Sequence, residues 1–310
     1  MPIFWKSKTL LAKVEATYGT DAVPVAATNA ILATDVTFSP MEGEDVERNL
    51  ELPKMGASSS LPAGVYSKLT FSVELAGSGT LGVAPGWGPL LRMCGVAETI
   101  TAATKVEYNP VSTAHSSGTI YFAIGTTRHV MTGVRGTATV KVSAQGIPML
   151  MFTLWGLFAV PTTQAVVSPN LSAFKAPVIA SKANTPTFTI GAAAFVLREF
   201  EFDLGCDVQM RMLMGSEGAV IVDKKEGVKT TVEAVDLATY DPFSVSMGQA
   251  MKSLQLIHGT AAGLRVQIDI AQATQKRLSA YQQQQNILEW PLEFTPLQNA
   301  GDDQWKLTLN

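Results

Sequence analysis

The strongest constraint in this sequence is a two-residue alternation of apolar and polar side chains in segments bounded by glycine and proline. In residues 65–75 every second side chain is apolar from Leu69 to Leu75, and residues 195–204 repeat the pattern from Phe200 to Leu204. Successive side chains of a β-strand point to opposite faces, so this pattern predicts strands with one face in a core. A chain of this kind folds mainly into antiparallel sheets.

Composition narrows the class of protein further. The chain has 310 residues, of which 46% are hydrophobic and 16% charged. The charged fraction is below the roughly 25% that is typical of soluble domains, which predicts that much of the surface is covered by other copies of the chain. The net charge of −3 argues against a protein that binds nucleic acid through a basic stripe.

The order strand, loop, strand, short helix occurs twice. In the first half these segments are residues 35–38, a polar run 41–53, a loop 54–64, a strand 65–75 and a helix 87–94. In the second half they are residues 195–204, a loop 215–227, a strand 228–237 and a helix 245–258. Phe38 and Phe202 lie 164 positions apart, as do Gly95 and Gly259, the glycines expected to cap the helices.

Further strands are expected at the end of each half. In the first they span residues 119–124, 128–134, 137–144 and 149–158, with turns at Gly125, Gly136 and Gln145-Gly146. The apolar stretch 147–160 is shorter than the roughly 20 residues of a membrane helix and contains Pro148, so a buried strand is expected there. In the second half the expected strands are 264–270, 287–294 and 305–309.

These patterns predict a mainly β fold with two tandem β-sandwich or half-barrel domains, each carrying one short α-helix. Residues 161–186 contain four prolines and little charge, as in a linker. The expected division is a first domain at residues 1–160, a linker at 161–194 and a second domain at 195–310.

Catalytic and cofactor motifs are weak. Residues 77–82 match G-x-G-x-x-G, but Pro85 and Gly86 prevent a helix from starting there, so a flexible loop is favoured over a nucleotide site. No histidine is spaced from another ligand as in a metal site, and Cys94 lies on an apolar helix face where a packed thiol is favoured over a nucleophile. We therefore expect no catalytic residue, metal or cofactor.

Two features bear on cellular location. Cys94 and Cys206 are too few for a disulfide framework, which favours a reducing compartment. The first 19 residues contain no apolar segment of the kind found in secretory signals.

Carboxylates recur on one face of the alternating strands. The set is Glu47, Glu51, Glu74, Glu199, Glu201, Asp203, Glu233, Asp269, Glu289 and Glu293. One interpretation is a solvated sheet face, and another is an acidic surface that many subunits present together. A glycosidase acid/base pair is the third, although no aromatic platform for a sugar is evident.

The loop at residues 54–64 is rich in small side chains. It contains Lys54, Met55, Gly56, Ser58, Ser59, Ser60, Leu61, Pro62 and Gly64. It is either a long hairpin loop or, as long loops often are, a functional segment, here suited to docking on a neighbouring subunit.

Several stretches together resemble a known family. They are residues 10–21 (LLAKVEATYGTD), 119–129, 133–140, 147–158 and the closing segments 286–297 and 302–309. In texture and order they are similar to the major tail tube protein of long-tailed, non-contractile bacteriophages.

The resemblance implies tail-tube-like β-sandwich domains in a structural virion protein that is not an enzyme. Such subunits form rings, often of six, that stack into a hollow tube. Two domains in one chain imply a homotrimeric, pseudo-hexameric ring. The carboxylates above are then candidates for the lumen, where double-stranded DNA passes and is repelled, and residues 54–64 are candidates for contact between rings.

The resemblance also implies partners and a location. The partners are the tape-measure protein, the tail terminator and the distal tail or baseplate proteins, and the location is the virion tail after assembly in the bacterial cytoplasm. The alternatives are another tube-like component, such as a terminator or secretion-system subunit, and a monomeric carbohydrate-binding or hydrolytic β-sandwich.

Overall fold

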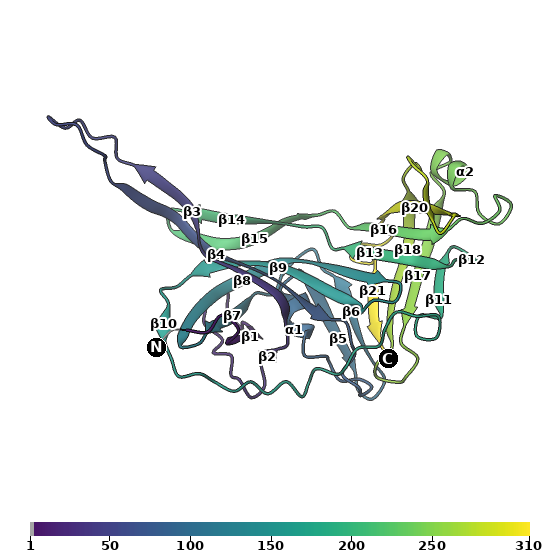
Figure 1. Cartoon of the computed structure of the whole chain (residues 1–310), viewed down its shortest axis with the longest axis horizontal. Helices are drawn as coiled ribbons and strands as arrows, with labels where there is room; N and C mark the ends of the chain where they lie inside the picture. Colours follow the sequence, from purple (N-terminus) through teal and green to yellow (C-terminus); the bar gives the residue numbers. More distant parts are fainter. Residues whose placement is uncertain (1–2) are drawn as a thin grey trace.

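The computed structural model of the chain describes residues 3–310 and is mainly β, with antiparallel sheets and two short helices (Figure 1). The expected fold class is confirmed. None of the helices in the described range is long and apolar enough to cross a membrane.

The first half of the chain contributes ten strands and one helix. In order they are β1 (Lys8–Val14), β2 (Ala30–Ile31), β3 (Thr34–Glu47), β4 (Ser60–Glu74), α1 (Gly88–Arg92), β5 (Val96–Thr101), β6 (Lys105–Pro110), β7 (Gly118–Ile124), β8 (Thr127–Ser143), β9 (Met149–Phe158) and β10 (Thr162–Thr163).

The second half contributes eleven strands and one helix. In order they are β11 (Thr187–Ile190), β12 (Ala193–Ala194), β13 (Leu197–Asp203), β14 (Cys206–Leu213), β15 (Ser216–Lys224), β16 (Gly227–Glu233), α2 (Pro242–Met247), β17 (Met251–His258), β18 (Val266–Gln275), β19 (Gln282–Gln284), β20 (Ile287–Pro296) and β21 (Lys306–Leu309).

Seven of these strands form one antiparallel sheet that crosses both halves, which we call the long sheet. Its order is β3–β4–β9–β8–β13–β16–β20. One register row of its inner face runs Val73, Leu150, Val140, Phe202, Val228 and Phe294, and all six are buried. Burying these side chains from water is the main favourable term in holding the layers together.

The halves meet where β8 pairs with β13, with residues 139–143 opposite residues 199–203. We call this pairing the seam. The long strand β8 makes it possible, because its first part pairs with β7 and its last part with β13. The other layers are β2–β1–β7 in the first half and a sheet of β11, β17, β18, β21, β6 and β5 that again joins the halves.

The apolar core extends through both halves as one cluster. The predicted domain boundaries at residues 160 and 195 therefore remain a prediction, because neither the long sheet nor the core is interrupted between the two halves. The order of elements nevertheless repeats in part: β3–β4, α1, β7–β8 and β9 correspond to β13–β16, α2, β17–β18 and β20. The first half has the additional hairpin β5–β6 after α1, and the second half has the hairpin β14–β15 between β13 and β16.

Three local predictions are wrong. Residues 245–258 are not one helix: α2 begins after its N-cap Asp241 and ends at Gly248, and strand β17 follows, so Gly259 caps no helix. Residues 215–227 are not a loop, because β15 lies there. Gly136 makes no turn, since it lies inside β8, where an added Cβ would come within 2.3 Å of Thr153 O on β9.

His258, at the end of β17, is buried, and its Nδ1 lies 2.9 Å from Thr185 Oγ1. Burial lowers the pKa of His258 below its usual range. Below the unfolded pKa of about 6.5, the unfolded chain therefore binds more protons than the folded one. The contribution is fully present above that pH and is lost as the pH falls through the folded pKa.

We therefore expect urea-unfolding free energies to fall between about pH 7 and pH 5 in the wild type, and to fall less steeply in His258→Asn. The Asn side chain keeps a polar group opposite Thr185 and does not titrate. An unchanged slope in the variant would contradict this assignment.

Candidate assembly surfaces

The outer face of the long sheet gathers most of the predicted carboxylates. One register row runs Glu74, Met149, Lys141, Glu201, Lys229 and Glu293 across six strands. Glu199 and Asp203 lie two residues to either side of Glu201 and so share its face. Glu233 and Glu289 are opposite each other at the far end of β16 and β20.

The other three predicted carboxylates lie elsewhere. Glu47 is the last residue of β3 and Glu51 follows in the exposed loop at residues 48–59. Asp269 is on β18, in the sheet of β11, β17, β18, β21, β6 and β5, which we call the second layer. On the outer face of this layer it accepts hydrogen bonds from Gln255 and Gln267.

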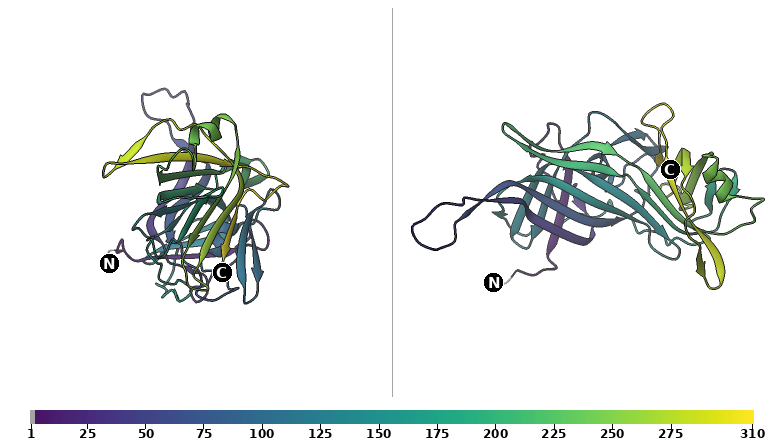
Figure 2. Two further views of the ribbon diagram at one scale, coloured as in Figure 1. Left: turned by 90° about the vertical axis from the view of Figure 1, so that its right-hand side faces the viewer. Right: turned by 90° about the horizontal axis from the view of Figure 1, so that it is seen from above.

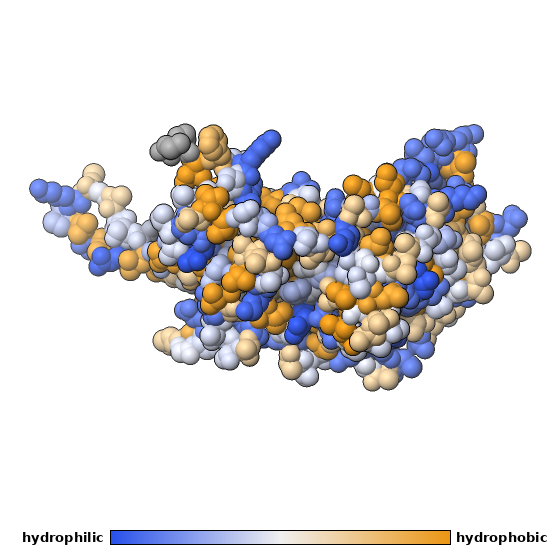
Figure 3. Space-filling model, turned by 90° about the horizontal axis from the view of Figure 1, so that it is seen from below, coloured by the Kyte–Doolittle hydropathy of each residue, from blue (hydrophilic) through white to orange (hydrophobic). Residues whose placement is uncertain are grey.

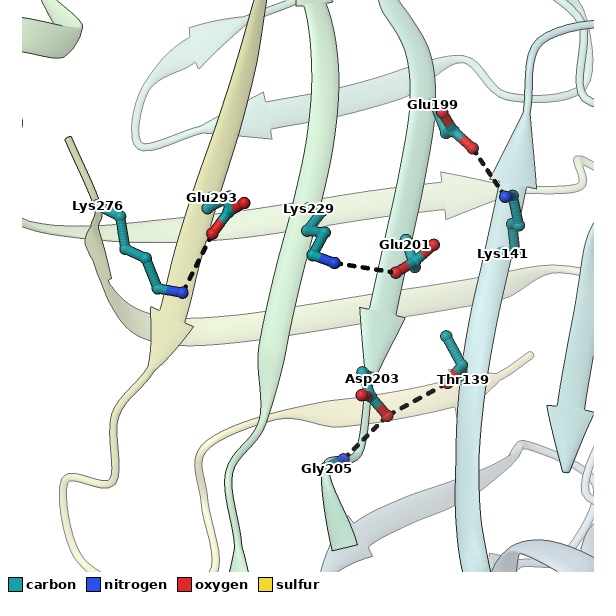
Figure 4. A network of polar contacts seen from close by, with 9 residues as sticks. All are labelled: Thr139, Lys141, Glu199, Glu201, Asp203, Gly205, Lys229, Lys276 and Glu293. Atoms are coloured by element: carbon teal, nitrogen blue, oxygen red, sulfur yellow. Dashed lines mark hydrogen bonds and ion pairs between the residues drawn. The ribbon is translucent and has the colours of Figure 1, made fainter. Parts of the chain in front are cut away.

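Lysines stand among these carboxylates (Figure 4). Lys141 Nζ lies 3.1 Å from Glu199 Oε1, and Lys229 Nζ lies 3.8 Å from Glu201 Oε1. Lys276 Nζ lies 3.1 Å from Glu293 Oε2. Partly exposed pairs of this kind contribute about 1 kcal/mol or less each, so the face is a mixed-charge surface with a small negative excess rather than a purely acidic wall.

Asp203 and Glu289 differ from the exposed pairs. Asp203 Oδ1 accepts hydrogen bonds from Thr139 Oγ1 across the seam at 3.2 Å and from the Gly205 amide at 3.0 Å. Glu289 is buried and bound by Arg198, and this hydrogen bond raises the pKa of the guanidinium. These two carboxylates hold strands in place as well as adding charge.

Two hairpins extend from the long sheet. The first arm is residues 41–64 at the outer ends of β3 and β4, and it projects far beyond the rest of the chain (Figure 1). Its tip is the loop 48–59, so residues 60–64 of the predicted loop belong to strand β4. The side chains at the tip are exposed, and Met55 is completely so.

The second arm is the β14–β15 hairpin, residues 206–224, which lies along the first half (Figure 2). The Tyr18 hydroxyl accepts a hydrogen bond from the Ala219 amide at 2.7 Å, and Arg135 Nη1 donates to Ala219 O at 3.0 Å. The Arg135 guanidinium also stacks on the Tyr18 ring. Burial raises the pKa of Tyr18, so its hydroxyl stays protonated.

The root of the second arm is fixed near the end of α1. Lys224 Nζ donates to Gly95 O at 2.6 Å and to Val111 O at 2.7 Å. Cys206 Sγ lies 3.3 Å from Cys94 O, and both thiols are buried. Burial raises the pKa of Cys206 to about 11 and that of Cys94 well above its usual range.

Glu15 holds the segment that carries Tyr18. Its carboxylate accepts hydrogen bonds from Ser117 Oγ, Thr119 Oγ1 and the amides of Gly19 and Gly133. Neither the Glu15 anchor nor the second arm is predicted from the sequence. For the arm a signal is present, because Val208, Met210 and Met212 alternate with polar residues and Met214-Gly215 fits a two-residue turn.

The comparison with protein families decides the class. Residues 5–248 match the family described as phage tail tube protein. This chain belongs to that family. The match runs from the N-terminal segment through the seam and the second arm to α2. Comparison with curated proteins finds no match.

Membership of the tail tube family makes this chain a structural component of the phage tail tube. This assignment rests on the family match and not on a metal site. Among residues 3–310, no group of three or more His, Cys, Asp or Glu side chains is arranged to hold a metal ion.

The Tyr18 contact gives a test of how the second arm is held. Tyr18→Phe removes the acceptor of the Ala219 amide and should lower the local stability of the arm by about 1 kcal/mol. Amide hydrogen exchange at residues 216–221 should become faster by the factor that corresponds to this loss of about 1 kcal/mol. Tyr281→Phe, at an exposed tyrosine of the second half, is the matched control, and an equal effect in both variants would contradict the assignment.

Proposed function

We propose that copies of this chain assemble head to tail into rings of three, and that the rings stack into a tube through which double-stranded DNA passes into the host. Membership of the tail tube family supports the tube. One end of the long sheet supports the ring: within the described chain, β3 has a partner on one side only, whereas β20 at the other end is also paired with β18 and β19. A closed ring pairs such edges and removes them from solvent.

The single observation that supports three chains per ring is the seam. It joins two hairpin-helix-hairpin units edge to edge inside one chain. Each chain then supplies two of the six positions of a tube ring, in a pseudo-hexameric trimer of two-domain subunits. The resemblance of several sequence stretches to tail tube proteins of long-tailed, non-contractile phages supports a tail of that type. The tape-measure, terminator and distal tail proteins are then the partners in the virion tail.

The outer face of the long sheet is proposed to line the bore. Its carboxylates are Glu74, Glu199, Glu201, Asp203, Glu233 and Glu293, with Glu289 on the same face but buried against Arg198. A slight negative excess, with Lys141, Lys229 and Lys276 each paired to a carboxylate and Lys68 over the Trp155 ring, keeps phosphates from binding without repelling neighbouring subunits strongly. The tip of the first arm, around Met55 and Ser58, is proposed to contact the next ring along the tube.

Electron microscopy of the purified protein with size-exclusion chromatography tests the assembly. We expect rings or tubes with a central channel, and a ring mass of three chains. A protein that stays monomeric at high concentration contradicts the proposal, and a ring of six chains contradicts the trimer.

The charge of the proposed bore gives a second prediction. In tubes of Glu201→Gln/Glu293→Gln, Lys229 and Lys276 lose their partners, so a short fluorescent DNA duplex should be retained at low salt and released as salt is raised. Co-sedimentation of the duplex with the tubes measures this. The matched control is Glu107→Gln/Asp269→Asn, which makes the same charge change on the second layer; equal retention by both variants would contradict the lining.

A further inference from the structure

The two arms are equivalent in position but not in surroundings. Each leaves the outer end of the first hairpin of its half, and both point in the same direction along the molecule (Figure 1). The second arm packs on the half of the chain that lies in that direction. The first arm lies against the second only at its root, where Gly64 faces Met212, and the rest of it projects past the end of the molecule (Figure 1).

The side chains of the two arms reflect this difference. On the second arm, Ala219 and Ile221 are buried against the first half. On the first arm, the cross-strand neighbours Val46 and Leu61 are 54% and 57% exposed. Apolar pairs in this position on a two-stranded hairpin are expected to be covered, because an isolated hairpin is at best marginally stable in water.

The surface that would cover them is visible at the opposite end of the molecule. In the first half, the residues that follow α1, Met93 and Cys94, are fully buried, and the root of the second arm lies over them. In the second half, the residues at and after the end of α2 are open to solvent: Met247 is 87% exposed and Met251 is 59% exposed. Figure 3 shows apolar residues both along the arm and at the opposite end of the chain.

Charge is complementary between the same two ends. The first arm carries five carboxylates, Glu42, Glu44, Asp45, Glu47 and Glu51, against the two cations Arg48 and Lys54. Residues 271–285, from the end of β18 through β19, contain no carboxylate and two cations, Lys276, which is paired with Glu293, and Arg277; the carboxylate of Asp241 lies at the start of α2 and not at its end. Opposite charges on two surfaces that meet favour their encounter and set their register.

We propose that the first arm of one copy lies along the second half of the next copy, over the end of α2, as the second arm lies along the first half of its own chain. The proposal rests on the ring described above and names the surface by which its neighbours hold each other. A second copy of this chain therefore covers the exposed end of α2. The root of the first arm makes this contact within one ring, and its tip remains free to contact the next ring.

Chemical cross-linking tests this placement in the full-length chain. The native thiols are both buried, so a short bis-maleimide will join only introduced cysteines. In Leu61→Cys/Met247→Cys, one position is on the first arm and the other is the last residue of α2. The arm and α2 lie at opposite ends of one copy (Figures 1 and 2), so a link between the two cysteines must join two copies. Electrophoresis of assembled material should show linked dimers and trimers, with little linkage at concentrations where the protein is monomeric.

The matched control is Leu61→Cys/Val160→Cys, since Val160 is also largely exposed, at 77% against 87% for Met247, but lies after β9 in the first half. We expect several-fold fewer linked species from the control. Tubes that form normally but link no better through Met247 than through Val160 would overturn this inference and leave the proposed function standing. Failure of the wild type to form rings or tubes would overturn the proposed function, and the inference with it.

Discussion

Backbone hydrogen bonding between β8 and β13 is the interaction on which the rest of the structure depends. It continues the sheet of the first half into the second, so that Val140 and Phe202 fall in one buried row and Lys141 and Glu201 in the exposed row beside it. A shift of one residue would turn Phe202 to solvent and Glu201 into the core. The Thr139–Asp203 hydrogen bond across the pair adds a side-chain constraint to the same register.

This seam also explains why the two halves are hard to separate as domains. The core is shared, and β21 from the end of the chain pairs with β6 from the first half. A repeated order of elements is compatible with such a merged structure, because a seam inside a chain and a contact between chains obey the same pairing rules. The seam is therefore the pattern for the contact between copies in the proposed ring.

The sequence predicted the strands well because alternation reports one buried face, as at Phe200 and Phe202. It failed at residues 245–258, where Met247, Met251 and Leu254 fit a helical period, but Gly248 ends the helix and pairing with β18 makes the remainder a strand. It predicted ten carboxylates on one face of the alternating strands, and seven of them lie on one face of the long sheet. It did not separate Glu47, Glu51 and Asp269 from these seven, since alternation gives the face of a strand but neither its end nor the sheet to which it belongs.

The buried sulfur atoms at the root of the second arm have a consequence for the particle after it leaves the cell. Because burial holds the pKa values of Cys94 and Cys206 above their usual range, few thiolates form at neutral pH, and neither sulfur is open to a reagent in solution. A subunit with its thiols buried in this way can be exposed to oxygen without the two thiols cross-linking one copy to another. The contact between the second arm and the end of α1 therefore depends on packing and hydrogen bonds and does not change with the redox state of the surroundings.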